Sequence, residues 1–142
     1  MPAPADVQTT NGGTTPGRPE AADTVVLTFA GTVNPDLVIS GWDGSPTTVT
    51  VTFTHSGNNY WLTIDDPGGA ILWNLGAVGL DGHYTNDVSF TGSTMTASGD
   101  TVTVVLGSAG AGTIFTVSTP STMLWWTPTG FATESGPADA EF

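Results

Sequence analysis

Basic side chains are almost absent from this chain. Its 142 residues include 13 acidic side chains against a single basic one, Arg18, so the formal net charge at pH 7 is −12. Proteins that bind nucleic acids or anionic membrane surfaces need clustered Lys and Arg to contact phosphates. We therefore expect no nucleic acid partner and no membrane partner. Catalysis through a Schiff-base lysine or an arginine finger is excluded for the same reason.

Cysteine is absent too, which excludes disulfides, thiol catalysis and cysteine metal sites. The two histidines, His55 and His83, lack the spacing of a zinc site. The chain has no GxSxG motif of the kind that carries a nucleophilic serine. It holds only three glutamates, two of them near the C-terminus, which disfavours a glycosidase. We expect no enzymatic activity, no metal and no cofactor.

Long apolar runs are missing as well. No stretch reaches the roughly 18 apolar residues of a membrane-spanning helix, and the start, MPAPADVQTTNGG, does not read as a signal peptide. Residues 1–23 show no periodicity, and their prolines oppose a regular helix. Two interpretations stay open for this segment: a disordered tail, or an extended arm that becomes ordered on a partner.

From Thr24 onward the sequence alternates between apolar and polar residues, as strands with one buried face do. The clearest example is 47–54 (TTVTVTFT), in which threonines separate the apolar positions. Further strands are expected in these ranges: 25–29, 60–64, 70–75, 87–91, 93–97, 101–106, 113–117 and 121–126. The expected core residues include Val49, Val51, Phe53, Leu62, Val102 and Val104. Eight or nine short strands separated by Gly, Asp and Asn turns predict an all-β sandwich or small barrel.

Five tryptophans are the most informative large side chains: Trp42, Trp61, Trp73, Trp125 and Trp126. Trp125 and Trp126 are adjacent in an expected strand, so their side chains must point to opposite faces and one of them is expected outside the core. By the same parity Trp61 lies off the face of Tyr60 and Leu62. Three interpretations stay open for these rings: packing at the sandwich ends, a protein interface, or stacking on sugars.

Several aspartates fall in expected turns: Asp43, Asp65, Asp66, Asp81 and Asp87. Aspartate accepts hydrogen bonds from backbone N–H groups in turns, and it is also a ligand for calcium. No EF-hand loop or calcium-binding nonapeptide repeat is present. Turn chemistry is therefore the favoured interpretation, with a cation site as the alternative.

Two stretches carry a resemblance to known proteins. Residues 81–106 resemble the late hairpins of bacterial immunoglobulin-like domains, and residues 122–142 resemble the closing strand of small secreted or virion proteins of actinobacteria and their phages. The resemblance implies an immunoglobulin-like β-sandwich over residues 24–142, with a short C-terminal tail and an extended N-terminal arm over residues 1–23. It also implies a capsid decoration protein, or another minor structural protein, on the surface of a phage particle.

The expected function is therefore non-enzymatic display and contact. On this view the partners are the major capsid protein or other virion subunits, with further copies of the chain in the same assembly, and the location is the virion surface. The alternative is a secreted or cell-surface carbohydrate-binding or adhesive module, located outside a cell. The expected partner-binding residues come from the arm and from two tryptophans: Pro2, Pro4, Val7, Pro16, Arg18, Trp61 and Trp126.

Overall fold

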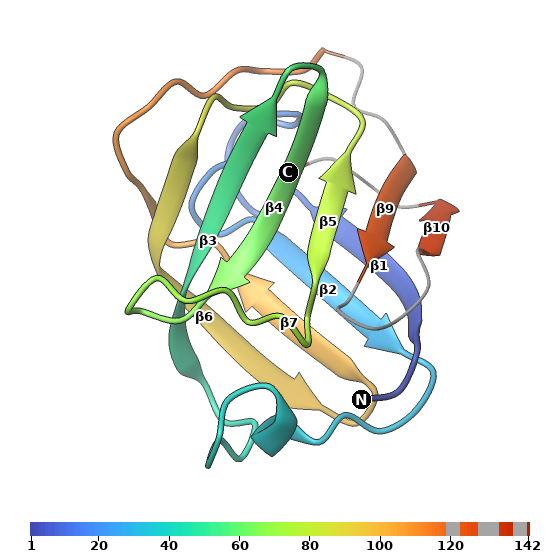
Figure 1. The fold of residues 1–142 in the computed structure, drawn as a ribbon. Helices are drawn as coiled ribbons and strands as arrows, with labels where there is room; N and C mark the ends of the chain where they lie inside the picture. Colours follow the sequence, from blue (N-terminus) through green and yellow to red (C-terminus); the bar gives the residue numbers. More distant parts are fainter. Residues whose placement is uncertain (119–122, 128–133, 138–141) are drawn as a thin grey trace.

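The structure, a computed structural model, describes residues 1–118, 123–127, 134–137 and 142. Within them the chain forms ten strands and one short 3₁₀ turn, η1 (Pro35–Leu37) (Figure 1). The strands are β1 (Pro4–Thr10), β2 (Thr24–Phe29), β3 (Thr47–Ser56), β4 (Asn59–Asp65), β5 (Ala77–Leu80), β6 (Val88–Ser98), β7 (Thr101–Val105), β8 (Ser108–Ala109), β9 (Met123–Thr127) and β10 (Glu134–Pro137). The part of the chain described here contains no helix long and apolar enough to cross a membrane.

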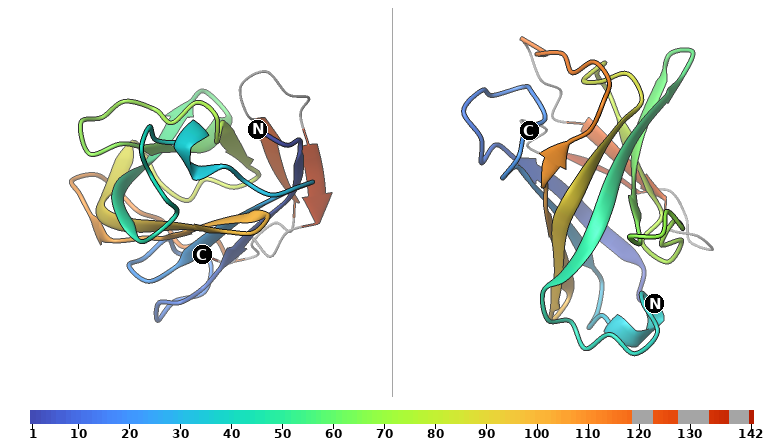
Figure 2. Two further views of the ribbon diagram at one scale, coloured as in Figure 1. Left: turned by 90° about the horizontal axis from the view of Figure 1, so that it is seen from below. Right: turned by 90° about the vertical axis from the view of Figure 1, so that its left-hand side faces the viewer.

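The strands form one continuous antiparallel sheet in the order β1-β2-β7-β6-β3-β4-β5-β9-β10, with β8 paired to β6. Strand β1 also contacts β9 and β10, so the sheet curls until its two edges meet. Figures 1 and 2 show the result: β3, β4 and β5 form one layer, and β1, β2 and β7 cross behind it. The predicted all-β, sandwich-like fold is confirmed.

The core lies between the two layers and follows the alternation of the strands. Every core residue named from the sequence is buried, with at most 1% of its surface exposed: Val49, Val51, Phe53, Leu62, Val102 and Val104. The aromatic rings pack edge-on within this core. Phe53 contacts both Phe90 and Phe142, and Phe29 meets Trp126 with ring centroids 4.8 Å apart. A fully buried phenylalanine or tryptophan of this kind is a main source of folding free energy.

The N-terminal segment is part of the sheet in this structure. Strand β1 pairs with β2 over Pro4–Thr10, and it buries the side chains of Pro4, Val7 and Thr9. Of the extended N-terminal arm expected over residues 1–23, Pro4–Thr10 therefore form a strand of the sheet. The physical reason is that β2 would otherwise expose a free hydrogen-bonding edge, which β1 covers.

Two expected strands, 87–91 and 93–97, form the single strand β6. A bulge separates its halves, because Val49 pairs with Ser93 while Val51 pairs with Phe90. Gly92 supplies the positive φ of +65° that this bulge requires. The buried Ser93 hydroxyl donates to the carbonyl oxygen of Phe90, 2.9 Å away, which stabilises the bend.

Two other expected strands were wrong. Residues 70–75 form turns in which the N–H of Leu75 bonds to the carbonyl of Leu72, and the strand begins only at Ala77. Residues 113–117 contribute an isolated bridge between Thr85 and Ile114 rather than a strand. Leu72 and Leu75 are buried in the first segment, and Ile114 and Val117 are partly buried in the second, but neither segment has strand geometry, so alternation alone misassigned them. The expected C-terminal tail lies largely outside the described residues.

Candidate functional site

A tight hairpin turn defines one end of the sandwich. Ser56 pairs with Asn59, so Gly57 and Asn58 alone connect β3 to β4. Gly57 has a φ of +59°, which matches the first central position of a type II′ turn, where glycine is strongly preferred. The sequence His-Ser-Gly-Asn-Asn therefore places two consecutive asparagine side chains, Asn58 and Asn59, at the tip of the hairpin. Both are exposed.

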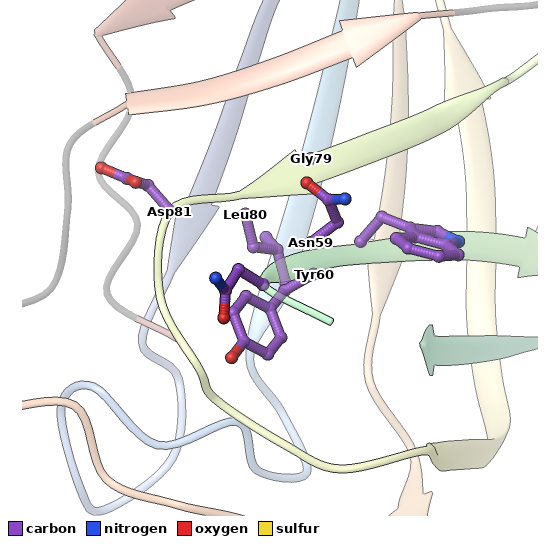
Figure 3. A pocket seen from close by; sticks show the side chains of 7 residues that line it. Asn59, Tyr60, Gly79, Leu80 and Asp81 are labelled. Atoms are coloured by element: carbon purple, nitrogen blue, oxygen red, sulfur yellow. The ribbon is translucent and has the colours of Figure 1, made fainter. Parts of the chain in front are cut away.

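A pocket of about 360 Å³ lies beside this hairpin (Figure 3). It is lined by residues of the turn, the start of β4 and the end of β5: Asn58, Asn59, Tyr60, Trp61, Gly79, Leu80 and Asp81. In Figure 3 Asp81 stands apart from Asn59 and Tyr60, at the start of the loop that follows β5. The lining combines aromatic rings with side-chain amides and a carboxylate, which is the composition of a site for a small polar ligand.

Strand pairing explains the position of Trp61 in this pocket. Trp61 pairs with Gly79 on the neighbouring strand β5. Paired residues project to the same face of a sheet, and a glycine leaves that face without a side chain. Gly79 itself therefore places no side chain against the Trp61 indole. Trp61 is half-exposed, as expected of a ring outside the core.

Four rings continue from the pocket across the same end of the molecule: His55, Tyr60, His83 and Phe115. The rings of Tyr60 and His83 stack with centroids 4.6 Å apart, and the Phe115 ring lies 4.7 Å from His83. His55 stacks against both Tyr60 and His83. Phe115 is one of the few large apolar residues that are exposed. We call these four residues the ring cluster; Tyr60 belongs both to it and to the pocket.

Polar contacts hold the two histidines of the ring cluster. The His83 Nε2 atom lies 3.0 Å from the Oδ1 atom of Asn86. The Asp87 carboxylate accepts a hydrogen bond from the backbone N–H of His55, and it lies 3.8 Å from the ring nitrogen Nδ1 of the same residue. That Nδ1 atom is buried and has no hydrogen-bond partner among the described residues. The ring cluster therefore contains both histidines of the chain, and the Asp87 carboxylate lies beside one of them, His55.

The loop that carries Phe115 is fixed by contacts with segments far away in sequence. The N–H of Phe115 bonds to the carbonyl of Tyr84, and the N–H of Val117 bonds to the carbonyl of Gly17. Arg18, the only basic residue besides the histidines, donates from Nη1 to the carbonyl of Ile114 at 2.9 Å. Arg18 was expected to bind a partner. In this structure Arg18 is half-buried and bonds to this loop.

The loop that carries Arg18 is itself organised by two carboxylates, Asp23 and Glu20. Asp23 is buried and accepts hydrogen bonds from the N–H groups of Gly12, Gly13 and Glu20, each at 2.9 Å. Glu20 in turn accepts from the backbone N–H groups of Thr14 and Thr15. Burial raises the pKa of the Asp23 carboxyl, and the three N–H donors oppose that rise. No local pattern in the sequence indicates this role for either carboxylate.

The other residues expected to bind a partner are distributed around the molecule. Trp126, one of the expected partner-binding residues, is fully buried, and its indole N–H donates to the carbonyl of Leu75 at 2.7 Å, so its ring is not accessible to a partner in this structure. Pro4 and Val7 are buried in β1 and cannot contact a partner while β1 stays in the sheet. Pro16 is exposed and Pro2 is half-buried. Of the expected set, only Trp61 lies in the pocket.

The remaining tryptophans are placed differently from one another. Trp42 is half-buried and donates from its indole N–H to the carbonyl of Ser45. Trp73 is the most exposed large apolar side chain among those described, with 58% of its surface accessible. The side chain of Trp125 lies outside the described part, although its backbone pairs with Gly79.

The aspartates singled out from the sequence act mainly in local hydrogen bonding. Asp66 accepts from the N–H of Ala70 in a turn, and the hydroxyl and N–H of Ser45 lower the pKa of the Asp43 carboxyl. Asp65 is buried and accepts from the hydroxyls of Thr52 and Thr63. Within the described residues, no group of three or more histidine, aspartate or glutamate side chains is placed to hold a metal ion.

The pocket therefore contains residues that the sequence analysis had not grouped. Asn58, Asn59 and Tyr60 are adjacent in the hairpin, and the turn signal in the sequence located them. Leu80 of the pocket and Phe115 of the ring cluster were not associated with them, because nothing in a single sequence indicates that β5 and the 107–118 loop reach the same end of the sandwich. Comparison with protein-family models, with curated proteins and with solved structures found no match to this chain.

Proposed function

We propose that this chain is a non-enzymatic binding module that attaches to its ligand through the hairpin end of the sandwich. The observation that carries the proposal is the pocket between β4 and β5, with Trp61 and Tyr60 in its lining and the ring cluster beside it. Aromatic side chains contribute most to recognition when a polar ligand or partner buries them. Backbone hydrogen bonds from Asn86 to Thr113 and from Phe115 to Tyr84 join the loop after β5 to the 107–118 loop, which limits the movement of these loops when a ligand binds.

Binding of the labelled protein to whole cells tests this function. Flow cytometry on a panel of bacterial species should find at least one species that binds the fluorescent protein saturably. Tyr60→Ala should weaken that binding at least tenfold, because it removes a ring shared by the pocket and the ring cluster. Trp73→Ala, an exposed ring at the other end, is the matched control and should leave binding unchanged. Equal binding by both variants, or no saturable binding to any species, would contradict the proposal.

Display on a phage particle remains our proposal for the setting in which such a module works. It rests on the resemblance of residues 122–142 to small secreted or virion proteins of actinobacteria and their phages, and on an acidic composition that suits an exposed protein. With β1 in the sheet, the prolines of the expected arm offer less free chain for docking. Mass spectrometry of purified particles from a phage that encodes the chain should find it in fixed proportion to the major capsid protein. If the chain is absent from such particles, the secreted or cell-surface binding module is the setting that remains.

A further inference from the structure

We infer that the pocket at the hairpin end binds a neutral saccharide, of roughly one or two sugar rings given its volume of about 360 Å³. This inference rests on the proposed function and adds the chemical class of the ligand. It follows from which recognition groups the pocket contains and which it lacks.

The groups present match the surface of a sugar. A pyranose ring has an apolar C–H face, which packs on an aromatic ring, and a rim of hydroxyl groups that both donate and accept hydrogen bonds. The pocket lining includes two aromatic residues, Tyr60 and Trp61. The amides of Asn58 and Asn59 each contain donors and an acceptor, so one amide can bond two neighbouring hydroxyls.

The missing groups exclude other ligand classes. Phosphate, sulfate and carboxylate ligands need cationic partners, but among the described residues that line the pocket the only charged one is Asp81. Arg18 is bonded to Ile114, and no other Lys or Arg exists in the chain. Nucleotides and acidic sugars such as uronic acids are therefore disfavoured by charge repulsion.

A peptide strand is excluded by the sheet itself. Recognition of an extended peptide usually adds a strand to a free sheet edge. Strand β5, which forms one wall of the pocket, pairs with β4 on one side and with β9 on the other. Its backbone groups are thus engaged within the sheet, and recognition at this wall depends on side chains.

A glycan array that contains both neutral and acidic glycans tests the inference. We expect the purified protein to bind one or more neutral glycans and to bind their uronic acid or sulfated counterparts at least tenfold more weakly. Isothermal titration calorimetry with the best neutral oligosaccharide then measures the variants. Trp61→Ala, which removes a ring, and Gly79→Val, which adds a side chain to the lining, should each weaken binding at least tenfold.

Two further variants keep the result interpretable if Trp61→Ala disturbs folding. Asn58→Ala changes an exposed turn residue and should still weaken binding about tenfold, whereas Trp73→Ala at the other end should change it less than twofold. Equal binding of neutral and acidic glycans, no glycan binding at all, or binding insensitive to Asn58→Ala and Gly79→Val would overturn the saccharide inference. If cell binding is still lost in Tyr60→Ala while the array is silent, the hairpin end binds a ligand of another class and only the inference fails.

Discussion

The two ends of the sandwich both expose tryptophan, but only one of them surrounds it with recognition groups. At the hairpin end Trp61 shares a pocket with two asparagines, and neighbouring loops are bonded to one another. At the opposite end, Trp73 is more exposed and adjoins η1, where the Asn74 amide donates to the carbonyl of the exposed Leu37 (Figure 1). Exposure of a ring is therefore a weaker indication of a site than its combination with polar groups on a fixed frame.

The largest expected effect contrasts a buried tryptophan with an exposed one. Trp126→Ala should lower the free energy of unfolding by about 3–5 kcal/mol, because it opens a cavity beside Phe29 and leaves the Leu75 carbonyl without its indole donor. Trp73→Ala should change it by no more than about 0.5 kcal/mol. Urea unfolding followed by circular dichroism measures both. Similar losses in the two variants would show that Trp73 has a structural role in the opposite end.

The loop behind the ring cluster depends on the Asp23 carboxylate. Asp23→Asn should cost about 1–3 kcal/mol of stability, since an amide cannot accept from Gly12, Gly13 and Glu20 without directing its own N–H group at one of them. Asp43→Asn, at a fully exposed carboxylate, is the control and should leave the unfolding midpoint unchanged. Thermal unfolding at pH 7 compares the two. No loss in Asp23→Asn would mean that the N–H groups find other acceptors.

The stability lost in Asp23→Asn should change with pH in a defined direction. Because burial raises the pKa of Asp23 above its ordinary value of 3.8, the folded state binds more protons than the unfolded state just above that pH. Asp23 therefore contributes most to stability at low pH, and its contribution falls as pH rises from 3.8 through the pKa of the folded state. The difference in stability between the wild type and Asp23→Asn should fall over this range and then level off. A difference that instead grows with pH would show that the three N–H donors dominate over burial.

A local effect is expected at Arg18. Arg18→Met keeps the aliphatic stem and removes the hydrogen bond to the carbonyl of Ile114. The amides of Phe115 and Val117 should then exchange with solvent about tenfold faster, equivalent to ~1.4 kcal/mol of local opening, while global stability changes little. Hydrogen exchange measured by NMR checks this, with the Trp73 amide as the unaffected reference. Unchanged exchange at both amides would show that the other backbone bonds hold the loop alone.

The sequence predicted the core and the hairpin because both follow from local rules. Alternation placed Val49, Val51 and Phe53 on one face, and Gly57-Asn58 marked the turn. The sequence did not predict β1, because its residues are largely polar. They form a strand by pairing with the edge of β2. The sequence also did not show which of Trp125 and Trp126 lies in the core. Strand alternation shows that the side chains of two neighbouring residues point to opposite faces, but not which of the two faces is buried.

The candidate site was predicted only in part for a related reason. Trp61 was singled out by its parity relative to Tyr60 and Leu62. Gly79 and Phe115 reach the same end through the order of strands in the sheet and through hydrogen bonds such as that between Phe115 and Tyr84. Such long-range pairings are set by tertiary packing, which a single sequence does not display.

The most direct test of the binding site is an NMR titration of the ¹⁵N-labelled protein with a panel of neutral disaccharides. The tryptophan indole signals report on different regions without any mutation, since Trp61 lies in the pocket, Trp73 at the opposite end and Trp126 in the core. We predict saturable shifts of the Trp61 indole and of the amides of Asn59 and Gly79, with the Trp73 and Trp126 signals unmoved. Saturable shifts centred on Trp73, or none with any disaccharide, would contradict the assignment of the hairpin end as the saccharide-binding site.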